Sequence, residues 1–225
     1  ILMQNIDNNS KLISEGVKQL GYSVAPEAIS QLLSYLEALK QWNARINLTA
    51  IRTDRGIIIR HFLDSLAGLE ALPAENSPEA PWRMMDVGTG AGFPGLPIKI
   101  LRPKIQLTLL EPRKKKAAFL HSVCGQLGLK GVSILAERLE MLAKQPQHQG
   151  RYDILMSRAL KASEFLGPAS SLLHGGGRIV LWAAQAGEDL LQKNKGFSGW
   201  KRSRLISYRL PFEGVERSLV MLQKI

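Results

Sequence analysis

The sequence predicts a protein of the α/β class, in which a mostly parallel sheet follows a helical N-terminal segment. Three observations support this class. Apolar residues follow helical spacing up to Leu72, five short apolar runs then alternate with helix-length segments after Trp82, and a glycine-rich loop directly follows the first of these runs. The 225 residues are 45% apolar and 22% charged, which is ordinary for one large globular domain or one domain with a small extension.

The first 80 residues are predicted to form a helical extension. Pro26 is typical of a helix start, and the polar stretch Asn43–Thr49 interrupts the helical pattern. Three prolines within residues 73–81 indicate a linker, so we expect an extension over residues 1–80 and a main domain over residues 81–225. The expected helices are Ser10–Leu20 with Ser10 as its cap, Pro26–Trp42 and Thr53–Leu72.

After the linker the pattern predicts a parallel sheet. Short apolar runs alternate with amphipathic stretches, as they do when each strand is followed by a helix that crosses back over the sheet. Two further runs near the end of the chain have no long helix between them, which indicates an antiparallel end to the sheet. The expected strands are Arg83–Val87, Leu107–Leu110, Val132–Leu135, Tyr152–Met156, Arg178–Trp182, Ser203–Leu210 and Ser218–Leu222, and the expected helices include Arg113–Leu127 and Ala162–Leu173.

The positive charge belongs wholly to the predicted main domain. Residues 1–80 contain seven Lys or Arg and nine Asp or Glu, whereas residues 81–225 contain twenty-three and ten, which together give the net charge of +11. Such a surface attracts polyanions, but charge alone favours an RNA partner no more than an ordinary basic surface. No apolar run is long enough to span a bilayer and residues 1–11 lack a secretory pattern, so we expect a cytoplasmic protein with no membrane partner.

The glycine-rich loop, Asp86–Gly95, is the clearest candidate for a ligand site. Its glycines allow a tight turn and close approach to a ligand, and the helix that follows adds backbone N–H groups. Glu111 ends the next predicted strand, where a carboxylate can accept both hydroxyls of an adenosine ribose. Asp86 would repel the pyrophosphate of a dinucleotide but suits the cationic methionine end of S-adenosylmethionine. We therefore favour S-adenosylmethionine over NAD as the cofactor, with a purely structural glycine turn as the remaining alternative.

Further motifs resemble a known family. They are Trp42-Asn43, Asn47-Leu48-Thr49, Arg60-His61-Phe62-Leu63-Asp64-Ser65, the glycine loop with Leu96-Pro97, Leu109-Leu110-Glu111 and Ser157-Arg158-Ala159. In these motifs and in their order the chain resembles the RsmG (GidB) family of bacterial 16S rRNA guanine-N7 methyltransferases. The resemblance implies a Rossmann-like, seven-strand S-adenosylmethionine-dependent methyltransferase sheet with a helical N-terminal extension. It also implies 16S rRNA or a small-subunit precursor as the partner, methylated at guanine N7 in the 530-loop region; we expect a monomer.

The resemblance extends to site residues. It implies that Gly88, Phe93, Leu139, Glu140 and Arg158 line the cofactor site and that Glu111 holds the ribose. The loop itself adds Asp86, Gly90 and Gly92 as expected cofactor contacts. The expected RNA contacts are Asn47, Arg60, His61, Asp64, Ser65, Arg113, Lys114, Lys115 and Lys116. Without the resemblance, Arg60 and Asp64 would be interpreted as an ordinary ion pair at helical spacing. One departure is that family members typically have a Lys-Gly pair where this chain has Ala183-Ala184. If that lysine helps to hold RNA, this protein either lacks it or supplies it from elsewhere, for example from Lys193 or Lys195.

The absence of certain catalytic motifs from the sequence limits which atom of a base the enzyme can methylate. Methylation at pyrimidine carbon 5 needs a cysteine nucleophile, but Cys124, the single cysteine, lies within a predicted helix and is expected to be a buried bystander. An exocyclic amine usually needs a polar–Pro–Pro–aromatic motif after the fourth strand, which here ends in Ser157-Arg158-Ala159. Guanine N7 has a lone pair and no proton to lose, so positioning can suffice.

We therefore expect no catalytic residue beyond substrate positioning, no metal, and Arg158 or Arg138 as the positioning candidates. Arg158 could hold the cofactor carboxylate or O6 of guanine, or form a surface ion pair. Aromatic residues among the cations of residues 193–209 could stack on bases; these are Phe197, Trp200 and Tyr208. Two other functions stay open at this point: an NAD-dependent oxidoreductase, and a non-enzymatic rRNA-binding assembly factor with a vestigial cofactor site.

Overall fold

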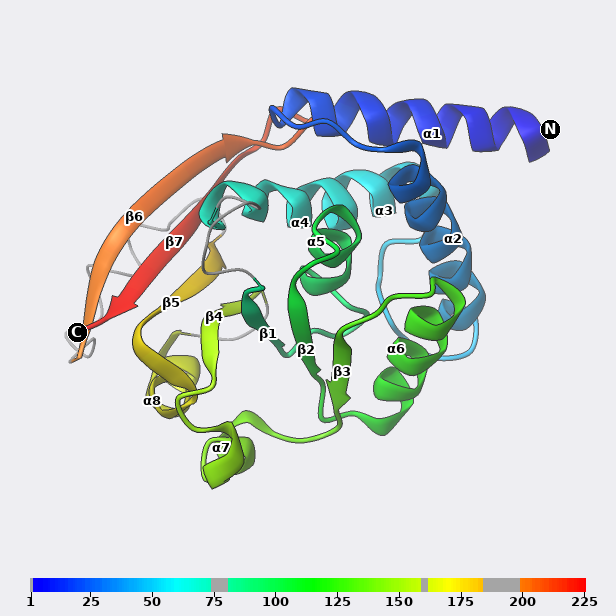
Figure 1. Ribbon diagram of the computed structural model, residues 1–225. Helices are drawn as coiled ribbons and strands as arrows, with labels where there is room; N and C mark the ends of the chain where they lie inside the picture. The colour runs from blue at the N-terminus through cyan, green and yellow to red at the C-terminus, as the bar shows by residue number, and fades with distance from the viewer. Residues whose placement is uncertain (1, 74–80, 159–161, 184–198) are drawn as a thin grey trace.

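Seven strands form one twisted sheet in the order β3-β2-β1-β4-β5-β7-β6 (Figure 1). The computed structural model describes residues 2–73, 81–158, 162–183 and 199–225. Strands β1 to β5 are parallel, and β7 runs antiparallel to both β5 and β6. The strands are β1 (Arg83–Val87), β2 (Gln106–Leu110), β3 (Val132–Leu135), β4 (Tyr152–Ser157), β5 (Leu173–Ala183), β6 (Trp200–Arg209) and β7 (Glu216–Lys224). The predicted α/β class and the antiparallel end of the sheet are confirmed.

Helices cover both faces of this sheet (Figure 1). The N-terminal helices, α5 (Gly95–Leu101) and α6 (Lys114–Gln126) pack on one face, while α7 (Leu139–Leu142), the 3-10 turn η3 (Pro146–His148) and α8 (Ala162–Leu172) lie on the other. Side chains alternate along β1 accordingly, because Met84 joins the first apolar cluster and Met85 the second. None of the helices in the described residues is long and apolar enough to cross a membrane.

The N-terminal region differs from its prediction at its first helix. Helix α1 spans Leu2–Gln19, so the predicted cap at Ser10 is wrong and Ser10 lies inside the helix. Ile13 and Val17 are fully buried, and the Asn9 amide donates to the carboxylate of Asp54 at 3.0 Å. These tertiary contacts stabilise a helix through polar residues whose own propensity is low.

The third predicted helix is continuous but irregular. Helix α2 (Pro26–Asn43) is followed by α3 (Asp54–Ile57), the π-helical segment η1 (Ile58–Leu63), α4 (Asp64–Leu66) and the 3-10 segment η2 (Ala67–Ala71). Thr53 caps this run, as its side chain accepts a hydrogen bond from the Gly56 N–H. Within η1 the hydrogen bonds run from residue i to i+5, so each turn is wider than a turn of an α-helix.

The N-terminal helices share an apolar core with the main domain. Leu32 and Leu36 of α2 belong to the same buried cluster as Ile98 of α5 and Phe119 of α6. The division at residue 80 stays a prediction. Strand β5 begins five residues earlier than predicted. The glycines at 175–177 lie within the strand, and the prediction excluded them because glycine has a low strand propensity.

Candidate active site

The glycine loop turns sharply where β1 ends. Gly88, Gly90 and Gly92 have positive φ angles of 70°, 62° and 101°, which side chains other than glycine rarely adopt. Behind them, Oδ2 of Asp86 accepts a hydrogen bond from the Thr89 hydroxyl at 2.6 Å and one from the Gly95 N–H at 2.8 Å. The loop is therefore fixed by a carboxylate on its inner side.

Asp86 is fully buried, and burial raises its pKa to about 7. It does not line the pocket described below, and the N–H of Gly95 at the start of α5 binds Asp86 instead of facing a ligand. Asp86 thus shapes the loop from behind, while its direct contact with the cofactor stays a prediction.

An open pocket of about 370 Å³ lies at the carboxyl ends of β1, β2 and β4, the edge where parallel α/β sheets bind ligands. It brings together the glycine loop, Glu111, Arg158 and a segment near Thr49. A Cβ atom added to Gly90 would meet nothing closer than the Lys116 ammonium at 3.9 Å, so the loop backbone faces open space. The lining residues are Leu48, Thr49, His61, Gly88, Thr89, Gly90, Ala91, Phe93, Glu111, Pro112, Arg113, Lys116 and Arg158.

The Glu111 carboxylate fits the predicted ribose partner. Its Oε2 accepts from the Gly90 N–H at 3.0 Å and its Oε1 from the Arg113 N–H at 2.9 Å. Each carboxylate oxygen has two lone pairs, so each can still accept a ribose hydroxyl. The residues present therefore fit S-adenosylmethionine: a glycine backbone that a ligand can approach, beside a carboxylate aligned by that same backbone.

An aromatic stack forms the opposite wall. The Phe93 ring lies between His61, whose centroid is 4.6 Å away, and Tyr35, at 5.5 Å. The Arg158 guanidinium lies 5.6 Å from the centroid of Phe93. His61 is neutral, because burial together with the nearby charge of Arg158 lowers its pKa to about 3.

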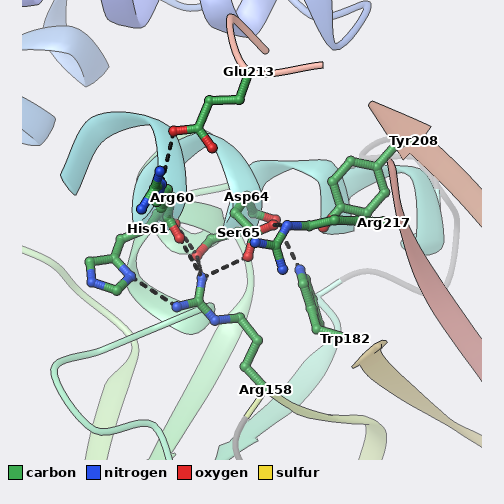
Figure 2. A network of polar contacts seen from close by, with 9 residues as sticks. All are labelled: Arg60, His61, Asp64, Ser65, Arg158, Trp182, Tyr208, Glu213 and Arg217. Atoms are coloured by element: carbon green, nitrogen blue, oxygen red, sulfur yellow. Dashed lines mark hydrogen bonds and ion pairs between the residues drawn. The ribbon is translucent and has the colours of Figure 1, made fainter. Parts of the chain in front are cut away.

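Arg158 is held from the interior by a polar network (Figure 2). Its Nη1 donates to Oδ2 of Asp64 at 3.0 Å, and its Nη2 lies 2.9 Å from Nδ1 of His61. The other Asp64 oxygen accepts from the Tyr208 hydroxyl at 2.8 Å and lies 3.3 Å from Nε of Arg217. Asp64 is 4% exposed, so this carboxylate joins the N-terminal helices to β4, β6 and β7 in the interior.

The ion pair between Arg60 and Asp64, which would have been the interpretation without the resemblance, does not form. Arg60 instead pairs with Glu213 at 2.8 Å, and Asp64 pairs with Arg158. The reason is tertiary, because the buried carboxylate of Asp64 is occupied by Arg158, Tyr208 and Arg217. Asp64 and Ser65 are buried, whereas Arg60 is about half exposed.

The basic residues before and within the first turn of α6 lie at the pocket. Arg113 and Lys116 line it, while Lys114 and Lys115 point outward as exposed side chains. None of these four cations has an ion-pair partner among the residues that the structure describes. Unpaired cations at a helix N-terminus are unfavourable, since the helix dipole is positive there.

Several predicted site residues lie outside the pocket. Leu139 is buried in the core at the start of α7, Glu140 is exposed in the same turn, and Arg138 is the N-cap residue of that helix. Asn47 is exposed in the segment after α2. Their contacts with cofactor or RNA stay predictions.

The two aromatic residues of the C-terminal basic segment that the structure describes, Trp200 and Tyr208, pack against the core. Trp200 is 8% exposed and the Tyr208 hydroxyl donates to Asp64, so the suggestion that these two stack on bases is wrong. Phe197, Lys193 and Lys195 lie outside the described residues, as do Ala159 and Ala184. The predicted burial of Cys124 in α6 is confirmed, and this burial raises the pKa of its thiol to about 11.

Sequence reasoning missed Thr49 and its support. The side chain of Asn43 accepts from the N–H groups of Leu48 and Thr49 at 2.8 and 3.0 Å and donates to the Thr49 carbonyl at 2.9 Å. The polar break after α2 was the available signal, since an Asn that ends a helix commonly binds the backbone that follows.

Solved structures with a similar fold include methyltransferases. The chain resembles a SAM dependent methyltransferase from Aquifex aeolicus with a TM-score of 0.54 at 15% identity, covering 76% of this chain and 93% of the other. It also resembles TrmN from Thermus thermophilus with a TM-score of 0.53 at 18% identity, covering 75% of this chain and 53% of the other. The fold and the pocket together define a Rossmann-like, S-adenosylmethionine-dependent methyltransferase.

Sequence comparison identifies the family to which this chain belongs. Residues 28–211 match the family model GidB, described as rRNA small subunit methyltransferase G. The ribosomal RNA small subunit methyltransferase G of Pelotomaculum thermopropionicum is 35% identical over 222 residues, which is 96% of this chain and 90% of the relative. The protein of that name from Deinococcus radiodurans is 36% identical, over 95% of this chain and 84% of the relative. The chain therefore belongs to the rRNA small subunit methyltransferase G family and is an enzyme, which decides against the dehydrogenase alternative.

Proposed function

We propose that the protein transfers a methyl group from S-adenosylmethionine to N7 of a guanine in the 530-loop region of 16S rRNA. One observation carries the choice of N7: no side chain that lines the pocket in the described residues is free to act as a general base. Glu111 is the only carboxylate among the lining residues and its remaining lone pairs are assigned to the ribose hydroxyls, while His61 is neutral and bonded through both ring nitrogens.

The reaction at N7 needs only positioning. Bound S-adenosylmethionine supplies an electrophilic methyl group whose carbon–sulfur bond breaks, with the electron pair left on sulfur, as the N7 lone pair bonds to the carbon. No proton moves, so the residues of this chain have to orient the two partners and exclude water. Glu111 would hold the ribose and Phe93 would form one wall, with Arg158 fixed beside it by Asp64.

The cations of α6 support an RNA substrate. Arg113 and Lys114 to Lys116 lie beside the pocket mouth without anionic partners in the part of the chain that the structure describes, at a place where they do not help the helix. Phosphate groups of a folded RNA would provide the missing negative charge. We also propose that the enzyme acts as a monomer in the cytoplasm, where small ribosomal subunits are assembled; light scattering of the purified protein checks the monomer.

The direct test is methyl transfer from labelled S-adenosylmethionine to small ribosomal subunits and to naked 16S rRNA, followed by chain cleavage at 7-methylguanosine. We expect label in 16S rRNA and cleavage at one guanine in the 530-loop region. Label that resists this cleavage would place the methyl group on another atom. Binding of cofactor and RNA without any transfer would instead support the assembly-factor alternative.

A further inference from the structure

Thr49 lines the pocket, and its hydroxyl is held in place by two hydrogen-bond partners within the protein. Its Oγ1 is 2.7 Å from Nε2 of His61 and 3.1 Å from the backbone nitrogen of Ile51. The three hydrogen bonds of Asn43 hold the backbone of this segment in place. The hydroxyl is therefore a preorganised group.

Arg158 sets the direction of the hydrogen bonds that reach Thr49. A guanidinium can only donate, so Nδ1 of His61 must accept from Nη2 of Arg158. The neutral imidazole then carries its proton on Nε2 and donates it to Oγ1 of Thr49. The low pKa of His61 keeps this arrangement across the physiological pH range.

The Thr49 hydroxyl consequently accepts two hydrogen bonds, one from His61 and one from the Ile51 N–H, which use both lone pairs of its oxygen. Its own O–H finds no acceptor among residues 2–73, 81–158, 162–183 and 199–225. Because Thr49 lines the pocket, it presents a donor, and only a donor, to whatever occupies that space.

We propose that Thr49 selects guanine by donating its hydroxyl proton to O6 of the target base. This inference rests on the proposed function at N7. Beside N7, guanine has the acceptor O6 whereas adenine has an amino group, which is itself a donor. With adenine in the pocket, two donors would face each other and both would lose their partners. Arg158 is a positioning residue in this arrangement, since it acts on the base through His61 and Thr49.

The hydrogen-bond direction can be tested without any substrate. Nitrogen-15 NMR of the four histidines distinguishes the two neutral tautomers of an imidazole. We expect His61 in the protein as isolated to carry its proton on Nε2 from pH 6 to pH 8. A proton on Nδ1, or a charged ring, would overturn the inference.

The contact with O6 can be tested by pairing two enzymes with two substrates. Small subunits are reconstituted with 16S rRNA that carries at the target position either guanine or 2-aminopurine, a purine that keeps N7 and lacks O6. On guanine we expect Thr49→Val to lower kcat/KM about tenfold and Thr49→Ser to stay near the unmodified protein. On 2-aminopurine, Thr49→Val and the unmodified protein should be equal.

Two results would overturn the contact: no loss on guanine, or an equal loss on both bases, which would mean that Thr49 acts only by supporting His61. If Thr49→Val does not fold, Thr49→Cys compared with Thr49→Ser gives the same test, since the two differ mainly in that the thiol is the weaker donor. If the unmodified protein methylates no guanine N7, the proposed function fails, and the NMR result still reports separately on the hydrogen-bond direction.

Discussion

The carboxylate of Asp64 binds the guanidinium of Arg158 at 3.0 Å, although the two residues lie 94 positions apart in the chain. The pair is largely shielded from water, with side chains 5% and 19% exposed. Arg217 lies against the same carboxylate, so one buried anion faces two cations. The position of Arg158 in the pocket wall therefore depends on the carboxylate of Asp64, which does not itself line the pocket.

Replacing Asp64 with Asn should destabilise the protein. The change leaves the guanidinium groups of Arg158 and Arg217 without their anion, and breaking a buried pair in this way costs about 3 kcal/mol. Urea unfolding measures the loss. Glu213→Gln is the matched control, because its partner Arg60 is 54% exposed and such pairs contribute less than about 1 kcal/mol. Equal losses in the two variants would contradict the role assigned to Asp64.

Asp86→Asn should change how stability depends on pH. The folded-state pKa of Asp86 is about 7, above the ordinary 3.8, so between these values the folded protein binds a proton that the unfolded chain has released. The stability contributed by this proton is full below about pH 4 and is lost as pH rises to about 7, a penalty of up to about 4 kcal/mol. Asn does not titrate, and its amide would replace Oδ1, a buried atom with no hydrogen-bond partner among the described residues.

The Tm difference between Asp86→Asn and the unmodified protein should therefore shift in favour of Asn between pH 5 and pH 8. Thermal unfolding at both pH values measures it. A difference that is independent of pH would show that Asp86 is ionised throughout.

Alanine substitutions at Gly92 and Gly90 should have different effects, the first on stability and the second on ligand binding. At Gly92 a Cβ atom would lie 2.6 Å from the Tyr35 hydroxyl and 2.5 Å from Cδ1 of Leu96, whereas at Gly90 it would enter open space. Both changes have the cost of positive φ, about 1–2 kcal/mol, and Gly92→Ala adds steric overlap. We expect Gly92→Ala to lose at least about 3 kcal/mol or to fail to fold, and Gly90→Ala to fold but to bind S-adenosylhomocysteine more weakly by calorimetry. Full affinity in Gly90→Ala would place the ligand away from this loop.

The exposed lysines of α6 should set the salt dependence of RNA binding. In the double variant Lys114→Gln, Lys115→Gln, the slope of log Kd for a 16S rRNA fragment against log salt should fall by about 1 to 2. Fluorescence anisotropy at several KCl concentrations measures it. The control is Lys104→Gln, Lys130→Gln, which removes the same charge before β2 and β3, at the opposite edge of the sheet. If both double variants changed the slope equally, general charge rather than this cluster would bind RNA.

How far the sequence predicts the structure depends on the range of each contact. The sheet and the glycine loop could be predicted because strand–helix alternation and the spacing from Asp86 to Glu111 are local patterns. The surroundings of Asp64 could not, since its partners lie 94, 144 and 153 positions away and its i−4 neighbour Arg60 suggested a different pair.

The π-helical segment escaped prediction for a related reason. Apolar spacing from Ile57 to Leu69 fits an ordinary α-helix, and only packing shows that the turn is widened between Ile58 and Leu63. Thr49 lies in a segment without periodicity, and its orientation depends on Asn43, His61 and Ile51 together. Sequence patterns therefore indicate which segments meet, while the direction of each hydrogen bond follows only from the assembled site.

The residues that line the pocket are spread along the chain from Leu48 to Arg158, so the pocket forms only when distant segments come together. An unfolded chain therefore has almost no affinity for the ligand, so that binding acts wholly on the native state. By mass action a ligand present at a hundred times its Kd would add about 2.7 kcal/mol to the free energy of unfolding. The supply of S-adenosylmethionine would thus regulate not only how fast this enzyme turns over but also how long each molecule survives proteolysis.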